Sequence, residues 1–254
     1  YSCLGIWPWL DFGNHPLRKA MSQFAQRSRE KEIMDDLDCS GPVLEQTLRE
    51  LKTINRWLGG NGVTNRGLSQ VVQRFPQDQY SLVDLGCGGG DMIAVMQAWA
   101  SKKHIPIQFI GADANANTIE LAKERQQALS GVHWQVANVF DPVFLGEQVD
   151  IATCTLFTHH FTDEELVQLF QGLKRKVRLA IVINDLHRHP LAYYSIKWLT
   201  RWFSKSPMVQ HDAALSVLRS FKRRDWNSIF AQAGLDQVEI HWRWAFRWQI
   251  CVYV

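Results

Sequence analysis

The chain has 254 residues, of which 46% are hydrophobic and 21% are charged, an ordinary composition for a globular protein. No apolar stretch approaches the roughly 20 residues that a membrane-spanning helix needs, so we expect no transmembrane segment. The 28 basic and 25 acidic residues give a net charge of +3. This surplus is too small to indicate nucleic-acid binding by itself.

Five cysteines are scattered along the chain, and no two of them have the CxxC spacing. A disulfide framework and a structural zinc site are therefore not expected, and a reducing compartment such as the cytoplasm fits better.

Residues 1–20 lack the basic start and apolar core of a secretory signal, and they carry little other information. No feature of the sequence indicates an oligomeric state.

Apolar residues at helical spacing predict a helix over 43–58, which Gly59 and Gly60 end, and a shorter helix over 67–75. From there strands and helices alternate. Apolar runs predict strands at 80–85, 107–112, 133–136, 149–155 and 177–183. The intervening helices are expected at 91–100, from Asn117 to about 129, and from the capping box of Thr162 and Glu165.

Near the chain end, apolar and polar residues alternate over 238–244 and again over 248–254, a pattern typical of an antiparallel hairpin. The sequence thus predicts an α/β fold with a doubly wound, mostly parallel seven-stranded sheet that ends in this hairpin. We expect a helical N-terminal extension and cap over 1–77 and one catalytic domain over 78–254.

A glycine cluster, Asp84-Leu85-Gly86-Cys87-Gly88-Gly89-Gly90, joins the first strand to a helix. Glycines allow a ligand to approach the backbone closely, although a tight turn alone would also explain them. Asp91 stands where the dinucleotide fingerprint GxGxxG requires glycine, which disfavours a nicotinamide cofactor and hence a dehydrogenase. Asp113, at the end of the second strand, is placed to bind the hydroxyls of a ribose.

The segment DLGCGGG resembles the DxGxGxG signature of class I S-adenosylmethionine-dependent methyltransferases, and Gly111-Ala112-Asp113 resembles their second-strand acid. The segments 134–141 and 150–161 are similar to the third- and fourth-strand motifs of the small-molecule enzymes, with Asn138 where Asp is usual. The resemblance implies a Rossmann-like fold and S-adenosylmethionine as cofactor. It implies these cofactor-binding residues: Asp84, Gly86, Cys87, Gly88, Gly90, Asp113, Ala114, Asn138, Val139, Thr155 and Leu156.

Methyl transfer also requires a group that orients the acceptor and often removes its proton. The candidate bases are His159 and His160 after the fourth strand and His187 after the fifth, with Asp185 as an orienting carboxylate. Each histidine could instead be a structural side chain. No histidine pair has a metal-ligand spacing with a partnered carboxylate, so no metal is expected.

Residues 187–223 form an unusually long insert, in which 191–204 is amphipathic. Residues 186–224 hold eight basic residues and one acid, Asp212. Three interpretations compete: a packed helix with a solvated basic face, a substrate lid, or a helix at a membrane surface, which would make the protein membrane-peripheral.

The aromatic insert favours a small apolar or aromatic substrate. Together with the Leu-Phe-Thr-His-His segment, it resembles quinone- and polyketide-modifying methyltransferases, which implies methylation of a phenol, hydroxyquinone or polyketide-like compound at oxygen or carbon. Two alternatives remain open: a non-catalytic protein that binds S-adenosylmethionine or a nucleoside, and an RNA methyltransferase that uses the basic insert.

Overall fold

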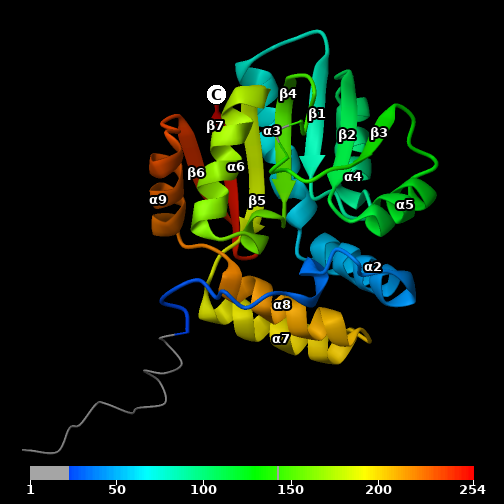
Figure 1. The fold of residues 1–254 in the computed structure, drawn as a ribbon, viewed down its shortest axis with the longest axis vertical. Helices are drawn as coiled ribbons and strands as arrows, with labels where there is room; N and C mark the ends of the chain where they lie inside the picture. The colour runs from blue at the N-terminus through cyan, green and yellow to red at the C-terminus, as the bar shows by residue number, and fades with distance from the viewer. Residues whose placement is uncertain (1–22, 142) are drawn as a thin grey trace, which may run out of the picture.

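The computed structural model describes residues 23–141 and 143–254, so the features of residues 1–20 lie outside it. The described part contains a seven-stranded sheet with the order β3-β2-β1-β4-β5-β7-β6 (Figure 1). The strands are β1 (Tyr80–Leu85), β2 (Ile107–Asp113), β3 (Val132–Val136), β4 (Val149–Thr155), β5 (Val177–Leu186), β6 (Val238–Arg243) and β7 (Arg247–Tyr253). The helices are α2 (Gly41–Trp57), α3 (Gly60–Arg74), α4 (Asp91–Lys102), α5 (Ala116–Arg125), α6 (Asp163–Lys176), α7 (Pro190–Phe203), α8 (Pro207–Arg219) and α9 (Arg223–Ala233), with 3-10 turns η2 (Ile33–Asp35) and η3 (Thr158–His160).

The first five strands are parallel, and β7 runs antiparallel between β5 and β6, which confirms the predicted fold class. The chain turns from β1 outward to β2 and β3 and then returns to β4 on the other side of β1. This reversal creates the switch point beside β1 and β4 at which open α/β sheets bind their ligands.

Two apolar layers hold the sheet between its helices. On one face, α6 and α9 bury a cluster that includes Phe170 and Trp226 against the sheet. On the other face, α3, α4 and α5 bury Leu68, Met96 and Ile119. Because both faces are covered, most residues of the central strands are apolar, as is typical of a parallel sheet.

Three predicted helix boundaries, in two helices, were wrong. Helix α3 begins at Gly60 rather than at 67, because Gly59 adopts a left-handed conformation (φ 69°) from which a second helix starts at once. Helix α5 is capped by Asn115 rather than Asn117, since the Asn115 side chain accepts hydrogen bonds from the amides of Asn117 and Thr118. It also ends at Arg125, four residues earlier than predicted.

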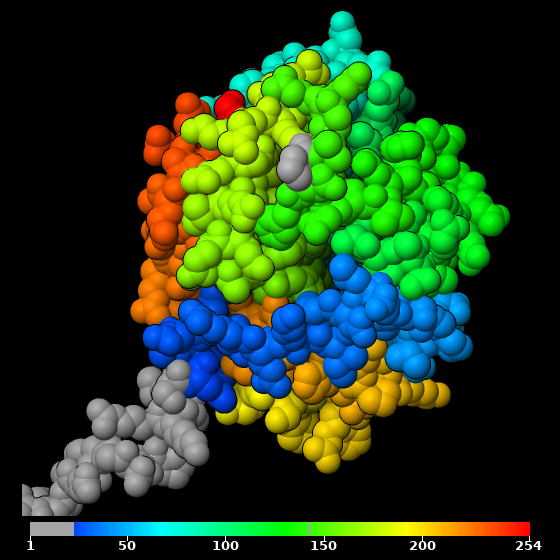
Figure 2. Space-filling view, viewed as in Figure 1, coloured from blue at the N-terminus to red at the C-terminus, as the bar shows by residue number. Residues whose placement is uncertain are grey.

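Helices α2, α7 and α8 lie beyond the edge at which the parallel strands end (Figure 1). Helix α8 packs against both α7 and α2. Residues 23–40, called the N-terminal segment below, run across the front of these helices, between them and the sheet (Figure 2). Among the described helices, none is both long and apolar enough to cross a membrane. The four cysteines in the described ranges are free thiols.

Candidate active site

A cavity of about 1350 Å³ opens at the carboxyl edge of the sheet. Its walls come from the ends of β1, β2 and β4, from α2, α7 and α8, and from the N-terminal segment. A site for one small ligand measures roughly 300–1000 Å³, so this cavity has room for two ligands side by side.

The glycine loop forms one wall of the cavity. Gly86 and Gly88 both have positive φ values, of 63° and 52°, and both line the cavity together with Cys87. At Gly88 a Cβ would have only Leu48 within 4 Å, so the backbone is open to a ligand there. Gly90 has a different role: it precedes α4 with φ 73°, packs against Trp134, and is not among the cavity-lining residues.

Two carboxylates lie behind this loop. Asp113 accepts hydrogen bonds from the amides of Gly88 (3.1 Å) and Asn115 (3.0 Å), so it braces the loop from the end of β2. Asp84 is buried and accepts from the Thr153 hydroxyl at 2.6 Å. Burial raises the pKa of Asp84 to about 7 and raises the pKa of Asp113 as well. Both carboxylates line the cavity, and Asp113 retains free acceptor positions toward it.

The other predicted cofactor residues also line the cavity: Ala114, Asn138, Val139, Thr155 and Leu156. The side-chain carbonyl of Asn138 accepts from the amide of Phe140 at 3.0 Å, so one of its acceptor positions is already used. The Thr155 hydroxyl forms a 3.0 Å hydrogen bond with that of Thr64.

A pair of histidines stands in η3, directly after β4. His159 is buried, and its Nδ1 lies 2.7 Å from Oδ1 of Asp185. Asp185 also accepts from the Thr158 hydroxyl and from the amides of His159 and Leu186. Burial by itself would raise the pKa of Asp185. The charge of His159 and its hydrogen bond have a larger, opposite effect, so the pKa of Asp185 lies well below its ordinary value. Asp185 thus fixes the orientation of the His159 ring.

His160 is held by a second carboxylate, and this one comes from the N-terminal segment. Its Nδ1 lies 2.6 Å from Oδ1 of Asp35, and its ring is 4.4 Å from that of His159. The Arg219 guanidinium donates to Asp35 and to the carbonyls of His159 and His160. Arg219 therefore connects α8, the N-terminal segment and η3.

Glu32 completes this group. Its side chain is buried, and Oε1 lies 3.7 Å from His159 Nε2 and 3.7 Å from Arg219 Nε. Burial raises the pKa of Glu32 to about 7, although the charges of His160 and Arg219 lower it in part. Glu32, His159 and His160 all line the cavity.

His187 does not belong to this group. Its ring packs against those of Trp248 and His189, and it is not among the residues that line the cavity. Burial, followed by the charges of His189 and Lys222, lowers the pKa of His187 to about 4. The structure therefore brings together His159, His160 and Asp185, but not His187.

The sequence did not indicate Glu32, Asp35 or Arg219 as site residues. Glu32 and Asp35 precede the first predicted helix, in a segment without a motif. Asp212 of α8 accepts hydrogen bonds from the amides of Ile33 and Met34 and so holds this segment in place. The one available signal was that Asp212 is the single acid in a strongly basic insert.

The methyltransferase domain family matches residues 82–179, which include the glycine loop and the two histidines. Over 216 residues the chain is 30% identical to a 2-phytyl-1,4-naphtoquinone methyltransferase of Trichormus variabilis, covering 82% of this chain and 87% of that relative. The chain belongs to the class I S-adenosylmethionine-dependent methyltransferases. A second 2-phytyl-1,4-naphtoquinone methyltransferase, from a Nostoc species, is 29% identical to this methyltransferase over 163 residues. The aligned region covers 62% of this chain and 68% of that relative.

Solved structures support the same fold. The plantazolicin methyltransferase BpumL, solved in complex with SAH, superposes on this methyltransferase with a TM-score of 0.60 at 13% identity, over 81% of this chain and 88% of that one. The C-methyltransferase domain of the citrinin polyketide synthase gives a TM-score of 0.54 at 16% identity, over 73% of this chain and 49% of that one. Together these findings establish an enzyme that uses S-adenosylmethionine. They do not support the alternatives that the sequence raised, namely a dehydrogenase, a non-catalytic binding protein and an RNA methyltransferase.

Proposed function

We propose that this methyltransferase methylates a phenol or hydroxyquinone, at oxygen or at the ring carbon beside it. The observation that carries the proposal is a pair of carboxylate-held histidines in the wall of a largely apolar cavity. The names of the relatives from T. variabilis and Nostoc, which specify a quinone, support an aromatic acceptor.

The acceptor side of the cavity is built from apolar side chains of α2, α7 and the segment after β4. They include Leu48, Leu51, Ile54, Phe157, Phe161, Ile196 and Leu199. Such walls favour a ring system over a small polar metabolite, and the few polar groups among them would orient it.

The cofactor side is the wall that contains the glycine loop. The open backbone at Gly88 suits the amino-acid part of S-adenosylmethionine, and Gly86, Cys87 and Asp84 line the cavity beside it. We assign Asp113 and Ala114 to the ribose. The remaining assignments follow the order of the strands: Asn138 and Val139 for the adenine, and Thr155 and Leu156 for the methionine portion. When bound, the cofactor supplies an activated methyl group on a sulfonium.

Asp113→Ala is expected to weaken binding of S-adenosylhomocysteine by roughly 10- to 100-fold, because a charged hydrogen-bond acceptor contributes about 1.5–3 kcal/mol. Calorimetric titration measures this change. Glu120→Ala, on the exposed side of α5, serves as the control and should bind normally. Unchanged affinity in Asp113→Ala would remove the ribose assignment.

The histidine cluster can remove a proton from an acceptor hydroxyl. When Asp185 is ionised, Nδ1 of His159 donates its hydrogen to that carboxylate. Nε2 of the neutral ring then carries no hydrogen and can accept a proton. Loss of the proton makes both the oxygen and the neighbouring ring carbon of a phenol more nucleophilic. One arrangement of residues therefore serves O- and C-methylation alike.

The direct test is transfer of a labelled methyl group from S-adenosylmethionine to a panel of acceptors that contains naphthols, hydroquinones and aliphatic alcohols. We expect product from the first two classes only. Mass spectrometry of the products separates O- from C-methylation. Turnover of aliphatic alcohols alone, or of none of the acceptors, would contradict the proposed substrate class.

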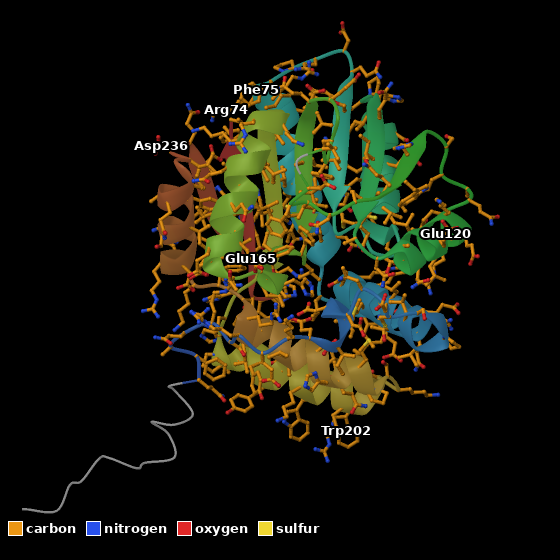
Figure 3. The ribbon with its side chains drawn as sticks, viewed as in Figure 1. Arg74, Phe75, Glu120, Glu165, Trp202 and Asp236 are labelled. Atoms are coloured by element: carbon orange, nitrogen blue, oxygen red, sulfur yellow. The ribbon has the colours of Figure 1, made fainter. Side chains whose placement is uncertain are left out.

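We further propose that the outer face of α7 contacts a membrane surface. Its side chains Leu191, Trp198, Trp202 and Phe203 are between 61% and 71% exposed, and Trp202 projects away from the sheet (Figure 3). Residues 190–205 contain three basic residues and no acid, which suits anionic lipid headgroups.

The inner face of the same helix supports this proposal, because Ala192, Ser195, Ile196 and Leu199 line the cavity. A phytyl-substituted quinone, as named for the relatives, is far more soluble in a bilayer than in water. Contact of α7 with lipid would place the cavity next to the phase that holds such an acceptor.

The variant Trp198→Ala/Trp202→Ala is expected to bind anionic phosphatidylglycerol vesicles at least roughly 10-fold more weakly than the wild type, because two large apolar anchors are lost. Co-sedimentation measures the bound fraction. Trp242→Ala, which removes an exposed tryptophan from β6, is the matched control. Failure of the wild-type protein to bind anionic vesicles would overturn the membrane contact.

A further inference from the structure

Three metal-ligating side chains converge in the cavity wall. One carboxylate oxygen of Glu32 and one ring nitrogen each of His159 and His160 lie within 4.8 Å of one another. Oε1 of Glu32 is 3.7 Å from Nε2 of His159. A single cation with ordinary zinc bonds of about 2.0–2.2 Å can join two atoms at that separation.

Each histidine already has the support that a metal ligand needs. Nδ1 of His159 is bonded to Asp185, and Nδ1 of His160 is bonded to Asp35. Metal-binding histidines almost always donate their second ring N–H to a carboxylate, a backbone carbonyl or a water, which fixes the tautomer and the ring orientation. Here the partner of both rings is a carboxylate, and in each ring Nε2 is the nitrogen left for a ligand.

Glu32 supplies the second, independent observation. Its side chain is only 5% exposed, yet Oε1 has no hydrogen-bond partner in the described part of the chain. A buried carboxylate oxygen without a partner is costly unless something compensates its charge. Nε of Arg219 lies 3.7 Å away, but it donates its hydrogen to the carbonyl of His159 instead.

The charges of the group are also unbalanced. The three carboxylates of Glu32, Asp35 and Asp185 face the two histidines, and the guanidiniums of Arg219 and Arg27 are bonded at the edge of this group. Acidic side chains outnumber these guanidiniums, and a divalent cation would offset the difference.

We propose that Glu32, His159 and His160 bind a divalent first-row transition metal of the zinc type inside the acceptor side of the cavity. Two imidazoles with one carboxylate suit zinc better than magnesium, which prefers oxygen ligands. The inference rests on the proposed function and deepens it. A cation at this position binds the acceptor hydroxyl and lowers its pKa, so that the O–H bond breaks and the proton leaves to solvent. His159 then holds the cation instead of taking the proton.

The test is calorimetric titration of the metal-free, full-length protein with Zn²⁺, and separately with Mg²⁺, without cofactor or acceptor. We expect one Zn²⁺ per chain and much weaker Mg²⁺ binding. Glu32→Gln should weaken Zn²⁺ binding by more than about 100-fold, and Asp35→Asn, which only loosens the support of His160, by about 10- to 100-fold. His241→Ala, in an exposed pair with Glu239, should bind as the wild type does.

Thermal melting without metal shows whether each variant is folded, and Asp35→Asn replaces Glu32→Gln if the latter is not. Absence of stoichiometric Zn²⁺ binding, or binding that neither variant weakens, would overturn the metal site. Methyl transfer to naphthols at full rate by verified metal-free enzyme would overturn the role of the cation and leave the proposed function intact. Zn²⁺ binding that both variants weaken would support the site even if no acceptor in the panel were methylated.

Discussion

His159→Ala is expected to lower kcat for methyl transfer by roughly 10²- to 10⁴-fold, the usual contribution of a positioned acid–base group. His159 is the more buried of the two histidines, and Asp185 fixes its ring. Its loss removes the group that activates the acceptor hydroxyl, whether by taking the proton or by holding a cation. Affinity for S-adenosylhomocysteine should stay unchanged, because the glycine loop and Asp113 are untouched.

Steady-state kinetics with a naphthol, together with calorimetry for the cofactor product, check this expectation. His133→Ala, on the exposed side of β3, is the control and should keep its activity. Asp185→Asn should lower kcat as well, since the amide cannot hold the same tautomer of His159. An equal loss of activity in His187→Ala with normal activity in His159→Ala would place the base outside the cavity.

Arg219→Met is expected to reduce the free energy of unfolding by about 3–5 kcal/mol, the usual cost of removing one partner of a buried ion pair. Arg219 is 6% exposed and donates to Asp35 and to the carbonyls of Glu30, His159 and His160. Methionine fills a similar volume but donates to none of them. Activity should fall too, because the N-terminal segment and η3 lose their common anchor.

Chemical denaturation measures the change in stability. Arg49→Met is the matched control, because Arg49 pairs with Glu45 on the exposed face of α2 and such pairs contribute at most about 1 kcal/mol. A loss in Arg219→Met no larger than that in Arg49→Met would show that the guanidinium does not hold the site together.

The wall that we propose for the cofactor could be located from the sequence because its residues are local. Residues 84–90 are consecutive, and a strand before them and a helix after them fix their position. Asp113 is the last residue of the next strand, so the parallel pairing of β1 with β2 places it near the loop. Gly90 was the exception, because its position is set by packing against Trp134, a contact that no motif encodes.

The acceptor side depends on contacts between residues far apart in the sequence. Both histidines were predicted, but their carboxylate partners are 26 and 125 positions away. Glu32 and Asp35 reach the cavity in a segment that Asp212 and Arg219 of α8 help to hold in place. His187 was chosen because it belongs to the polar residues that follow a strand predicted to end at 183. The strand continues through Leu186, and the His187 amide still pairs with the carbonyl of Phe246.

Two segments that line the proposed acceptor side, residues 27–36 and helix α8, lie outside the family-matched residues 82–179. Residues 27–36 and helix α8 are joined by the buried bonds of Arg219 and Asp212, so they behave as one module whose halves are nearly 180 positions apart. A chimera that exchanges only one half would separate Asp35 from its arginine. Altering acceptor selectivity by recombination with a relative therefore requires both halves to be transplanted together, while the methyl-donor half can stay unchanged.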